Sequence, residues 1–212
     1  SMLEPGKYAT TNITGTINIL NQMAEKGVQN IVFSSTAAVY GMPEYLPVDE
    51  SHPLNPVNFY GFTKLENERI FQWYGKLTGI RYAALRYFNA AGYDPNGRIK
   101  GLEQNPANLL PIIMETAAGT RESMQIFGND YDTVDGTGIR DYIHVTDLAF
   151  AHIKAMDYLM DKKANLTLNL ATGYGFSVLD VINQARAVTG NEISYKFVDR
   201  RPGDPAELVA VS

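Results

Sequence analysis

The stretch Asn30-Ile31-Val32-Phe33-Ser34-Ser35-Thr36 predicts the fold class of this 212-residue chain. Three apolar residues are followed at once by three small hydroxyl residues. An apolar run with such an ending is typical of a buried parallel strand whose carboxyl end carries polar groups. Open α/β sheets bind ligands beside these strand ends. We therefore expect an α/β protein with a parallel sheet and a ligand site where this strand ends.

A helix is predicted before this strand, at residues 8–27. Its apolar residues follow one another at steps of three or four: Ile13, Ile17, Leu20 and Met23. This spacing places them on one helix face, and Gly27 is a typical helix stop.

A second helix and a second strand are predicted after a proline-rich connection. The helix spans residues 60–79, and the strand spans residues 81–88 and ends in Asn89. A strand, a helix and a further parallel strand form a right-handed crossover. This topology brings Thr36, Tyr60 and Asn89 to the same edge of the sheet.

Tyr60 and Lys64 lie one turn apart on the second helix and therefore share a face. At about 6 Å and an effective dielectric near 20, the Lys64 charge favours the phenolate by roughly 3 kcal/mol, or about 2 pKa units. The buried stripe of this helix is expected from other residues: Phe62, Leu65 and Trp73. A lone Tyr-x-x-x-Lys pair is more often an amphipathic surface pair, but this one is predicted at a ligand-binding edge. The pattern therefore indicates a tyrosine base.

The pattern changes after Gly92, where we expect a second, smaller domain. We assign residues 1–90 to the first domain and residues 91–212 mainly to the second, with the strand at 167–172 returning to the first sheet. The predicted elements of the second part are a helix at 109–118, a strand at 140–145, a helix capped by Asp147 that runs to Met160, a strand at 167–170, a helix capped by Ser177 that runs to Val188, and a strand at 193–198.

Composition excludes several classes of function. The net charge is −5, so no basic surface is expected to bind nucleic acid or an anionic membrane. The chain has no cysteine, which excludes disulfides and thiolate chemistry and fits a reducing compartment such as the cytoplasm. No apolar run approaches the length of a membrane helix. The three histidines are too scattered to predict a metal site: His52, His144 and His152.

Six segments carry a resemblance to a known family. They are Asn12 to Thr16, Phe33 to Gly41, Tyr60 to Lys64, Leu85 to Asn89, Ile126 to Tyr131, and Gly136 to Asp147. With them the chain resembles the extended short-chain dehydrogenase/reductase family, and within it the enzymes that epimerise UDP-hexoses at C4. The resemblance implies a doubly wound, Rossmann-like parallel sheet, incomplete here, with a smaller α/β substrate-binding domain.

The resemblance also implies an NAD-dependent interconversion of UDP-glucose and UDP-galactose through a transient 4-keto sugar. Tyr60 would remove the proton of the 4-hydroxyl, Lys64 would hold the nicotinamide ribose and depress the tyrosine pKa, and Thr36 would bind the same hydroxyl. The residues that it implies for NAD binding are Asn12, Ser34, Thr36, Tyr60, Lys64, Tyr87 and Phe88.

For the UDP-hexose, the resemblance implies two guanidiniums at the diphosphate. Arginine suits this role because its planar fork forms bidentate hydrogen bonds. The implied substrate residues are Thr36, Asn89, Asn108, Leu109, Gln125, Phe127, Arg140, Arg201 and Asp204. Considered without the resemblance, Arg140 is more easily explained as a salt-bridge partner of a nearby aspartate, and Phe127 as a core residue.

One feature departs from the family pattern. Nothing in the sequence resembles the G-x-x-G-x-x-G loop that holds the dinucleotide pyrophosphate. We therefore expect a fragment of a longer protein, with the activity belonging to the parent. The family is commonly dimeric through two helices, here those near 8–27 and 60–78, and a homodimer is expected.

Three alternatives stay open. A 4,6-dehydratase or a decarboxylase belongs to the same family, but dehydratases carry an Asp-Glu pair where this chain has Ala37 and Ala38. An epimerase of N-acetylated UDP-hexoses is harder to separate, because Leu208, at the position of the family's sugar-pocket gate, is of intermediate size. A non-catalytic UDP-sugar-binding fragment is the third alternative, and it follows from the missing glycine loop.

Overall fold

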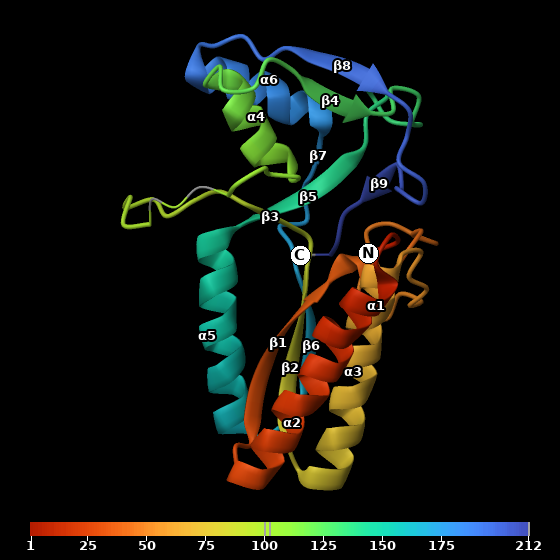
Figure 1. The fold of residues 1–212 in the computed structure, drawn as a ribbon, viewed down its shortest axis with the longest axis vertical. Helices are drawn as coiled ribbons and strands as arrows, with labels where there is room; N and C mark the ends of the chain where they lie inside the picture. Colours follow the sequence, from red (N-terminus) through yellow and green to blue (C-terminus); the bar gives the residue numbers. More distant parts are fainter. Residues whose placement is uncertain (100, 102, 212) are drawn as a thin grey trace.

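The computed structural model describes residues 1–99, 101 and 103–211. The molecule is elongated, with a parallel sheet and long helices in one half and a smaller group of strands and helices in the other (Figure 1). Within the described residues, no helix combines the length and apolar character needed to cross a membrane.

The first half is built on a three-stranded parallel sheet in the order β1-β2-β6. Its strands are β1 (Asn30–Thr36), β2 (Arg81–Tyr87) and β6 (Leu166–Leu170). Thr36 pairs with Tyr87, and Tyr87 pairs with Leu170. The carboxyl ends of all three strands therefore meet at one edge, as the strand–helix–strand order predicts.

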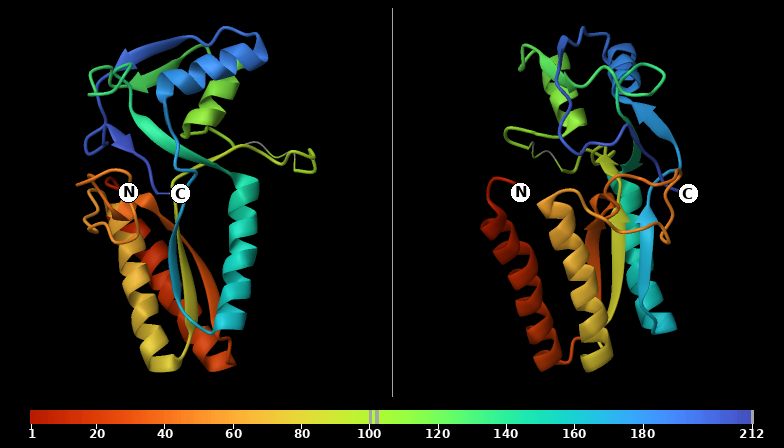
Figure 2. Two further views of the ribbon diagram at one scale, coloured as in Figure 1. Left: turned by 180° about the vertical axis from the view of Figure 1, so that it is seen from behind. Right: turned by 90° about the vertical axis from the view of Figure 1, so that its right-hand side faces the viewer.

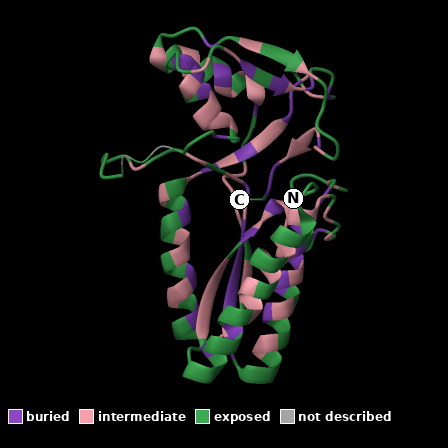
Figure 3. Cartoon of the chain, in the orientation of Figure 1, coloured by how far each residue is buried: buried purple, intermediate pink, exposed green. Residues whose placement is uncertain are grey.

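Helices cover both faces of this sheet, which makes it doubly wound (Figure 2). The helices α2 (Gly15–Lys26) and α3 (Phe59–Thr78) lie on one face, and α5 (Val145–Lys162) lies on the other. Alternate residues of β2 point to opposite sides, so that Tyr82 and Ala84 pack with Leu20 and Phe71, whereas Ala83 and Leu85 pack with Ala155 and Leu159. Figure 3 shows the buried residues concentrated along the central strand β2, whereas β1 and β6 are mostly of intermediate burial.

The first helical region starts earlier than predicted and is not uniform. It consists of α1 (Pro5–Tyr8), a π-helical segment (Ala9–Thr14) and α2, which ends at Gly27 with a φ of 71°. A π-helical turn often marks a functional part of a helix. Here it includes Asn12.

Helix α3 begins and ends as the sequence predicts, but its buried face is different. Asn58 caps its N-terminus by accepting from the Gly61 amide at 2.8 Å, and Gly79 ends it with a φ of 76°. Leu65 is buried, but Phe62 and Trp73 are 41% and 62% exposed, so the predicted stripe is wrong for both. The helix turns Glu68 and Phe71 toward the sheet instead, because Glu68 is neutralised by a buried arginine.

The second half contains two further groups of strands. One pairs β4 (Met124–Phe127) with β8 (Tyr195–Val198), and the other is centred on β5. The members of the second group are β3 (Asn89–Ala91), β5 (Ile139–His144), β7 (Gly175–Ser177) and β9 (Glu207–Leu208). The helices α4 (Leu109–Ala117) and α6 (Val178–Thr189) pack on β4 through Ile113, Ile126 and Ile182.

Two predicted helix caps in this half have different outcomes. Ser177 caps α6 as expected, and its side chain accepts from the Asp180 amide in a reciprocal capping box. Asp147 does not cap α5, because the helix begins at Val145 and the cap is His144. His144 Nδ1 accepts from the Thr146 amide at 3.2 Å, and Asp147 lies in the first turn.

Candidate active site

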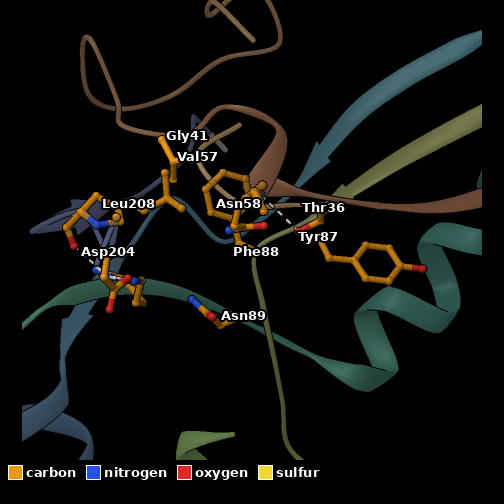
Figure 4. Close-up of a pocket in the computed structure, with 14 residues that line it drawn as sticks. Thr36, Gly41, Val57, Asn58, Tyr87, Phe88, Asn89, Asp204 and Leu208 are labelled. Carbon is orange, nitrogen blue, oxygen red and sulfur yellow. Dashed lines mark hydrogen bonds and ion pairs between the residues drawn. The ribbon is translucent and has the colours of Figure 1, made fainter. Parts of the chain in front are cut away.

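The carboxyl ends of the first sheet open into a cavity of about 190 Å³. Thr36 ends β1, Asn89 follows β2, and both line this cavity (Figure 4). Its opposite wall comes from the connection before α3 and from the chain near β9, through Val57, Asp204 and Leu208. The sheet edge therefore meets the second half of the molecule around this cavity, as expected for ligand sites of open α/β sheets.

Thr36 is held by its place at the end of the strand. Its Oγ1 accepts from the Ala38 amide at 3.2 Å and so caps the short 3₁₀ helix η2 (Ala37–Val39). The hydroxyl keeps its own hydrogen for another acceptor. A hydroxyl fixed in this way can donate to an oxygen in the cavity.

Tyr60 and Lys64 come together near this edge, but the pKa of Tyr60 is not shifted in the predicted direction. Lys64 Nζ lies 5.7 Å from the centroid of the Tyr60 ring and donates to the Ser34 carbonyl at 3.0 Å. Burial raises the pKa of Tyr60, and the side chain of Thr36 offsets only part of the rise. Burial also lowers the pKa of Lys64. The expected lowering of the tyrosine pKa by Lys64 is therefore not found in this structure, where burial of the phenol is the largest influence.

Three further residues expected at the cofactor lie beside α3 or near the carboxyl ends of β1 and β2, and their side chains already form hydrogen bonds. Asn12 donates to Thr63 Oγ1 at 2.9 Å. Ser34 and Tyr87 share a hydrogen bond of 2.8 Å between their hydroxyls. Figure 4 shows the Tyr87 ring directed away from the other residues of the cavity. Phe88 is buried and lines the cavity.

A second, larger cavity of about 460 Å³ adjoins the first, since Phe88, Asn89, Arg140 and Asp204 line both. The structure brings eight of the nine predicted substrate residues to its wall. They are Asn89, Asn108, Leu109, Gln125, Phe127, Arg140, Arg201 and Asp204. The ninth, Thr36, lines the smaller cavity.

The two predicted diphosphate arginines differ in their surroundings. Arg140 Nη2 forms a 2.5 Å ion pair with Asp204 and also donates to the Pro205 carbonyl, so much of its fork is used within the protein. The guanidinium of Arg201 instead stacks on the Phe127 ring, 3.9 Å from its centroid. In the part of the chain that the structure describes, no carboxylate lies within ion-pair distance of Arg201. Its donors are therefore free for an anion.

A buried polar network below the site was not predicted. Glu68 and Arg86 form a 2.7 Å ion pair with side chains 4% and 5% exposed, and Ser35 donates to Glu68. Arg86 also donates to the Tyr40 hydroxyl at 2.9 Å. No local pattern shows this pairing, because it depends on the sheet register. The cap Asn58, by contrast, carries a recognisable signal, since asparagine just before a helix is a typical N-cap.

The fold and the cavities define an α/β protein with a Rossmann-like doubly wound sheet and a ligand site at the carboxyl ends of its strands. Among the described residues, no group of three acidic or histidine side chains is placed to hold a metal. The chain belongs to the NAD dependent epimerase/dehydratase family, whose profile matches residues 1–171.

Individual relatives are similar over the whole chain. A UDP-glucose 4-epimerase from Halalkalibacterium halodurans is 49% identical, with 100% of this chain and 64% of that protein covered. The crystal structure of UDP-glucose 4-epimerase from Brucella ovis in complex with NAD is 42% identical at a TM-score of 0.94, covering 98% of this chain and 64% of that one. The enzyme from Bifidobacterium longum in complex with NAD+ and UDP is 40% identical at a TM-score of 0.92, covering 100% and 64%. The chain thus spans less than two thirds of the length of these proteins.

Proposed function

We propose that this chain supplies the catalytic residues and the sugar-nucleotide pocket of an NAD-dependent UDP-hexose 4-epimerase that interconverts UDP-glucose and UDP-galactose. The observation that carries the proposal is the meeting of Thr36, Tyr60 and Lys64 at the sheet edge, next to two adjoining cavities. The family membership and the names of the relatives support the same activity.

In this proposal Tyr60 is the base, and Thr36 holds the reacting hydroxyl. Tyr60 takes the proton from the 4-hydroxyl of the hexose, and Thr36 hydrogen-bonds the same oxygen. The 4-keto sugar then turns over in the cavity, and Tyr60 returns the proton to the oxygen on the other face. The raised pKa of Tyr60 means that the protein alone keeps the phenol neutral. A positive charge brought by the cofactor would favour the phenolate.

The residues around Lys64 fit the nicotinamide end of NAD. Among the described residues, Lys64 Nζ donates to the Ser34 carbonyl and pairs with no acidic side chain, so it has further hydrogens to donate to ribose hydroxyls. NAD bound there would supply the acceptor, and later the donor, of the hydride at C4 of the hexose. The cradle for the pyrophosphate is not among these residues, since the sequence has no glycine-rich loop.

The larger cavity is proposed to hold the UDP part of the substrate. Arg201, stacked on Phe127, offers the free guanidinium for the diphosphate. Arg140 would join it if its ion pair with Asp204 opened, and Asp204 would then be free to accept from a hydroxyl of the ligand. We propose that residues 1–90 bind the cofactor and that residues 91–212 mainly bind the UDP-sugar.

The test is the variant Tyr60→Phe, compared with Tyr174→Phe on an exposed tyrosine. Loss of a general base is expected to lower kcat for UDP-galactose by about 10²- to 10⁴-fold, whereas the control keeps its activity. UDP binding, measured by calorimetry, should stay unchanged in both variants. Full activity of Tyr60→Phe would contradict the proposal. Absence of NAD in a denatured extract of the purified protein would instead favour the non-catalytic binding fragment.

The size of the accepted sugar is a separate proposal. Leu208 lines the smaller cavity with Thr36 and Asn89, and a leucine leaves more room than a tyrosine would at this place. We therefore expect some turnover of UDP-N-acetylgalactosamine beside UDP-galactose. Turnover rates measured with UDP-galactose and UDP-N-acetylgalactosamine test this expectation. An enzyme that does not turn over the N-acetylated sugar nucleotide would contradict it.

A homodimer through α2 and α3 is also proposed. The outer faces of these helices carry large apolar side chains that are strongly exposed: Ile19, Phe62, Trp73 and Leu77. Analytical ultracentrifugation of the protein and of Trp73→Glu tests this, because a charge in the interface would shift the protein toward monomer. A wild-type monomer would contradict the proposal.

A further inference from the structure

A short chain of hydrogen bonds joins the end of β1 to helix α5. Ser34 Oγ lies 2.8 Å from the Tyr87 hydroxyl, which lies 2.5 Å from Nε2 of His152. The other ring nitrogen of His152, Nδ1, lies 2.7 Å from the Leu148 carbonyl oxygen. The rings of Tyr87 and His152 also meet edge to face, with their centroids 5.6 Å apart. In Figure 4 the Tyr87 ring extends toward this helix.

The Leu148 carbonyl sets the direction of every bond in this chain. A carbonyl oxygen only accepts, so Nδ1 of His152 must carry the hydrogen. In the neutral ring, Nε2 then accepts, and Tyr87 gives it its single hydroxyl hydrogen. The Tyr87 oxygen can therefore only accept from Ser34.

Ser34 is held from both faces of the sheet. Its side chain is bound through Tyr87 to α5, and its carbonyl oxygen accepts from Lys64 of α3 at 3.0 Å. We propose that His152 is a positioning residue, which fixes Ser34 through Tyr87 and thereby the place of the Lys64 ammonium group. This inference rests on the proposed function, in which Lys64 holds the cofactor ribose.

Removal of His152 leaves the Tyr87 hydroxyl without an acceptor in a partly buried site. The hydroxyl then turns toward Ser34, whose side chain loses its fixed orientation. None of Ser34, Tyr87 and His152 lines the larger cavity, where the UDP part is proposed to bind, and Ser34 and His152 do not line the smaller one either. The effect should therefore fall on kcat rather than on KM for the UDP-hexose.

The kinetic experiment compares His152→Gln with Lys154→Gln, an exposed position two residues further on α5. We expect His152→Gln to lower kcat for UDP-galactose by about 5- to 10-fold, the value of one neutral hydrogen bond, with KM changed less than twofold. Lys154→Gln should leave both unchanged. An unchanged kcat of His152→Gln, or an equal change in KM, would overturn the inference.

Two NMR measurements judge the inference without using activity. In ¹⁵N-histidine-labelled protein, the neutral ring of His152 should carry its hydrogen on Nδ1, and Tyr87→Phe should shift only its Nε2 resonance. In ¹³C-lysine-labelled protein, His152→Gln should move the Lys64 Cε resonance, and Lys154→Gln should not. A hydrogen on Nε2, or an unmoved Lys64 signal, would overturn the inference. If the protein lacked epimerase activity, these spectra would still decide it while the proposed function failed.

Discussion

The variant Glu68→Gln should destabilise the protein strongly, although it changes only one charge. The carboxylate of Glu68 accepts from Ser35 and twice from Arg86, at 3.1 and 2.7 Å, and both charged side chains are about 95% buried. Removing one charge leaves the Arg86 guanidinium buried without a counter-charge. Such a change typically costs about 3–5 kcal/mol of the free energy of unfolding. The lost stability comes from the packing of α3 against β2, which carry Glu68 and Arg86.

A double-mutant cycle shows whether this reasoning is right. The double variant Glu68→Leu/Arg86→Met replaces the pair by apolar side chains and should cost about 2–3 kcal/mol less than the sum of Glu68→Leu and Arg86→Met. Guanidinium unfolding followed by circular dichroism gives each free energy. The matched control is Glu66→Gln on the same helix, whose 2.5 Å pair with Arg69 is exposed, and it should change stability by less than about 0.5 kcal/mol. Additive single variants would refute the account of the buried pair.

Three further predictions concern the surroundings of the site. Gly61→Ala should lower kcat at least about tenfold and cost about 1–3 kcal/mol of stability, because an added Cβ overlaps the Ala38 carbonyl oxygen and pushes Tyr60 away from Thr36. Steady-state kinetics and thermal unfolding measure the two effects, and wild-type activity would contradict the prediction. Asn58→Ala should cost about 1 kcal/mol of stability and Asn58→Asp much less, since only the alanine removes the cap of α3. Burial raises the pKa of Tyr142 to about 12, so between pH 10 and 12 the folded protein keeps a proton that the unfolded chain loses. Stability should therefore fall as the pH rises through this window, and Tyr142→Phe, measured by urea unfolding, should make the fall less steep.

The sequence predicts the elements whose signals are local. The run ending in Ser34-Ser35-Thr36, the stops at Gly27 and Gly79, and the cap at Ser177 each depend on a few neighbouring residues. All four are found in the structure. The substrate residues came from the resemblance, since a stacked pair such as Phe127 and Arg201, whose members lie far apart in sequence, leaves no periodic trace.

The features that the sequence does not predict depend on contacts between distant residues. Phe62 and Trp73 fit a helical stripe, but the sheet receives the face with Leu65, Glu68 and Phe71, because Arg86 on a neighbouring strand neutralises the glutamate. The pKa of Tyr60 also depends on contacts that form only on folding. Its spacing from Lys64 is visible in the sequence, but the burial that raises its pKa exists only in the folded chain.

The π-helical segment at 9–14 has a consequence for how this protein can change in length. A π-helical turn holds more residues than an α-helical turn, so the loss of one residue there would leave an ordinary α-helix. Leu20 and Met23, which dock the helix on the sheet, come after the segment and would keep their places. Loss of Ile13 or Thr14 would rotate Asn12 off α3, and Asn12 donates to Thr63 and accepts through its carbonyl from Asn67. A deletion in this segment would therefore leave the first helix docked on the sheet. A deletion after Asn12 would break the polar contact between this helix and α3, which carries Tyr60.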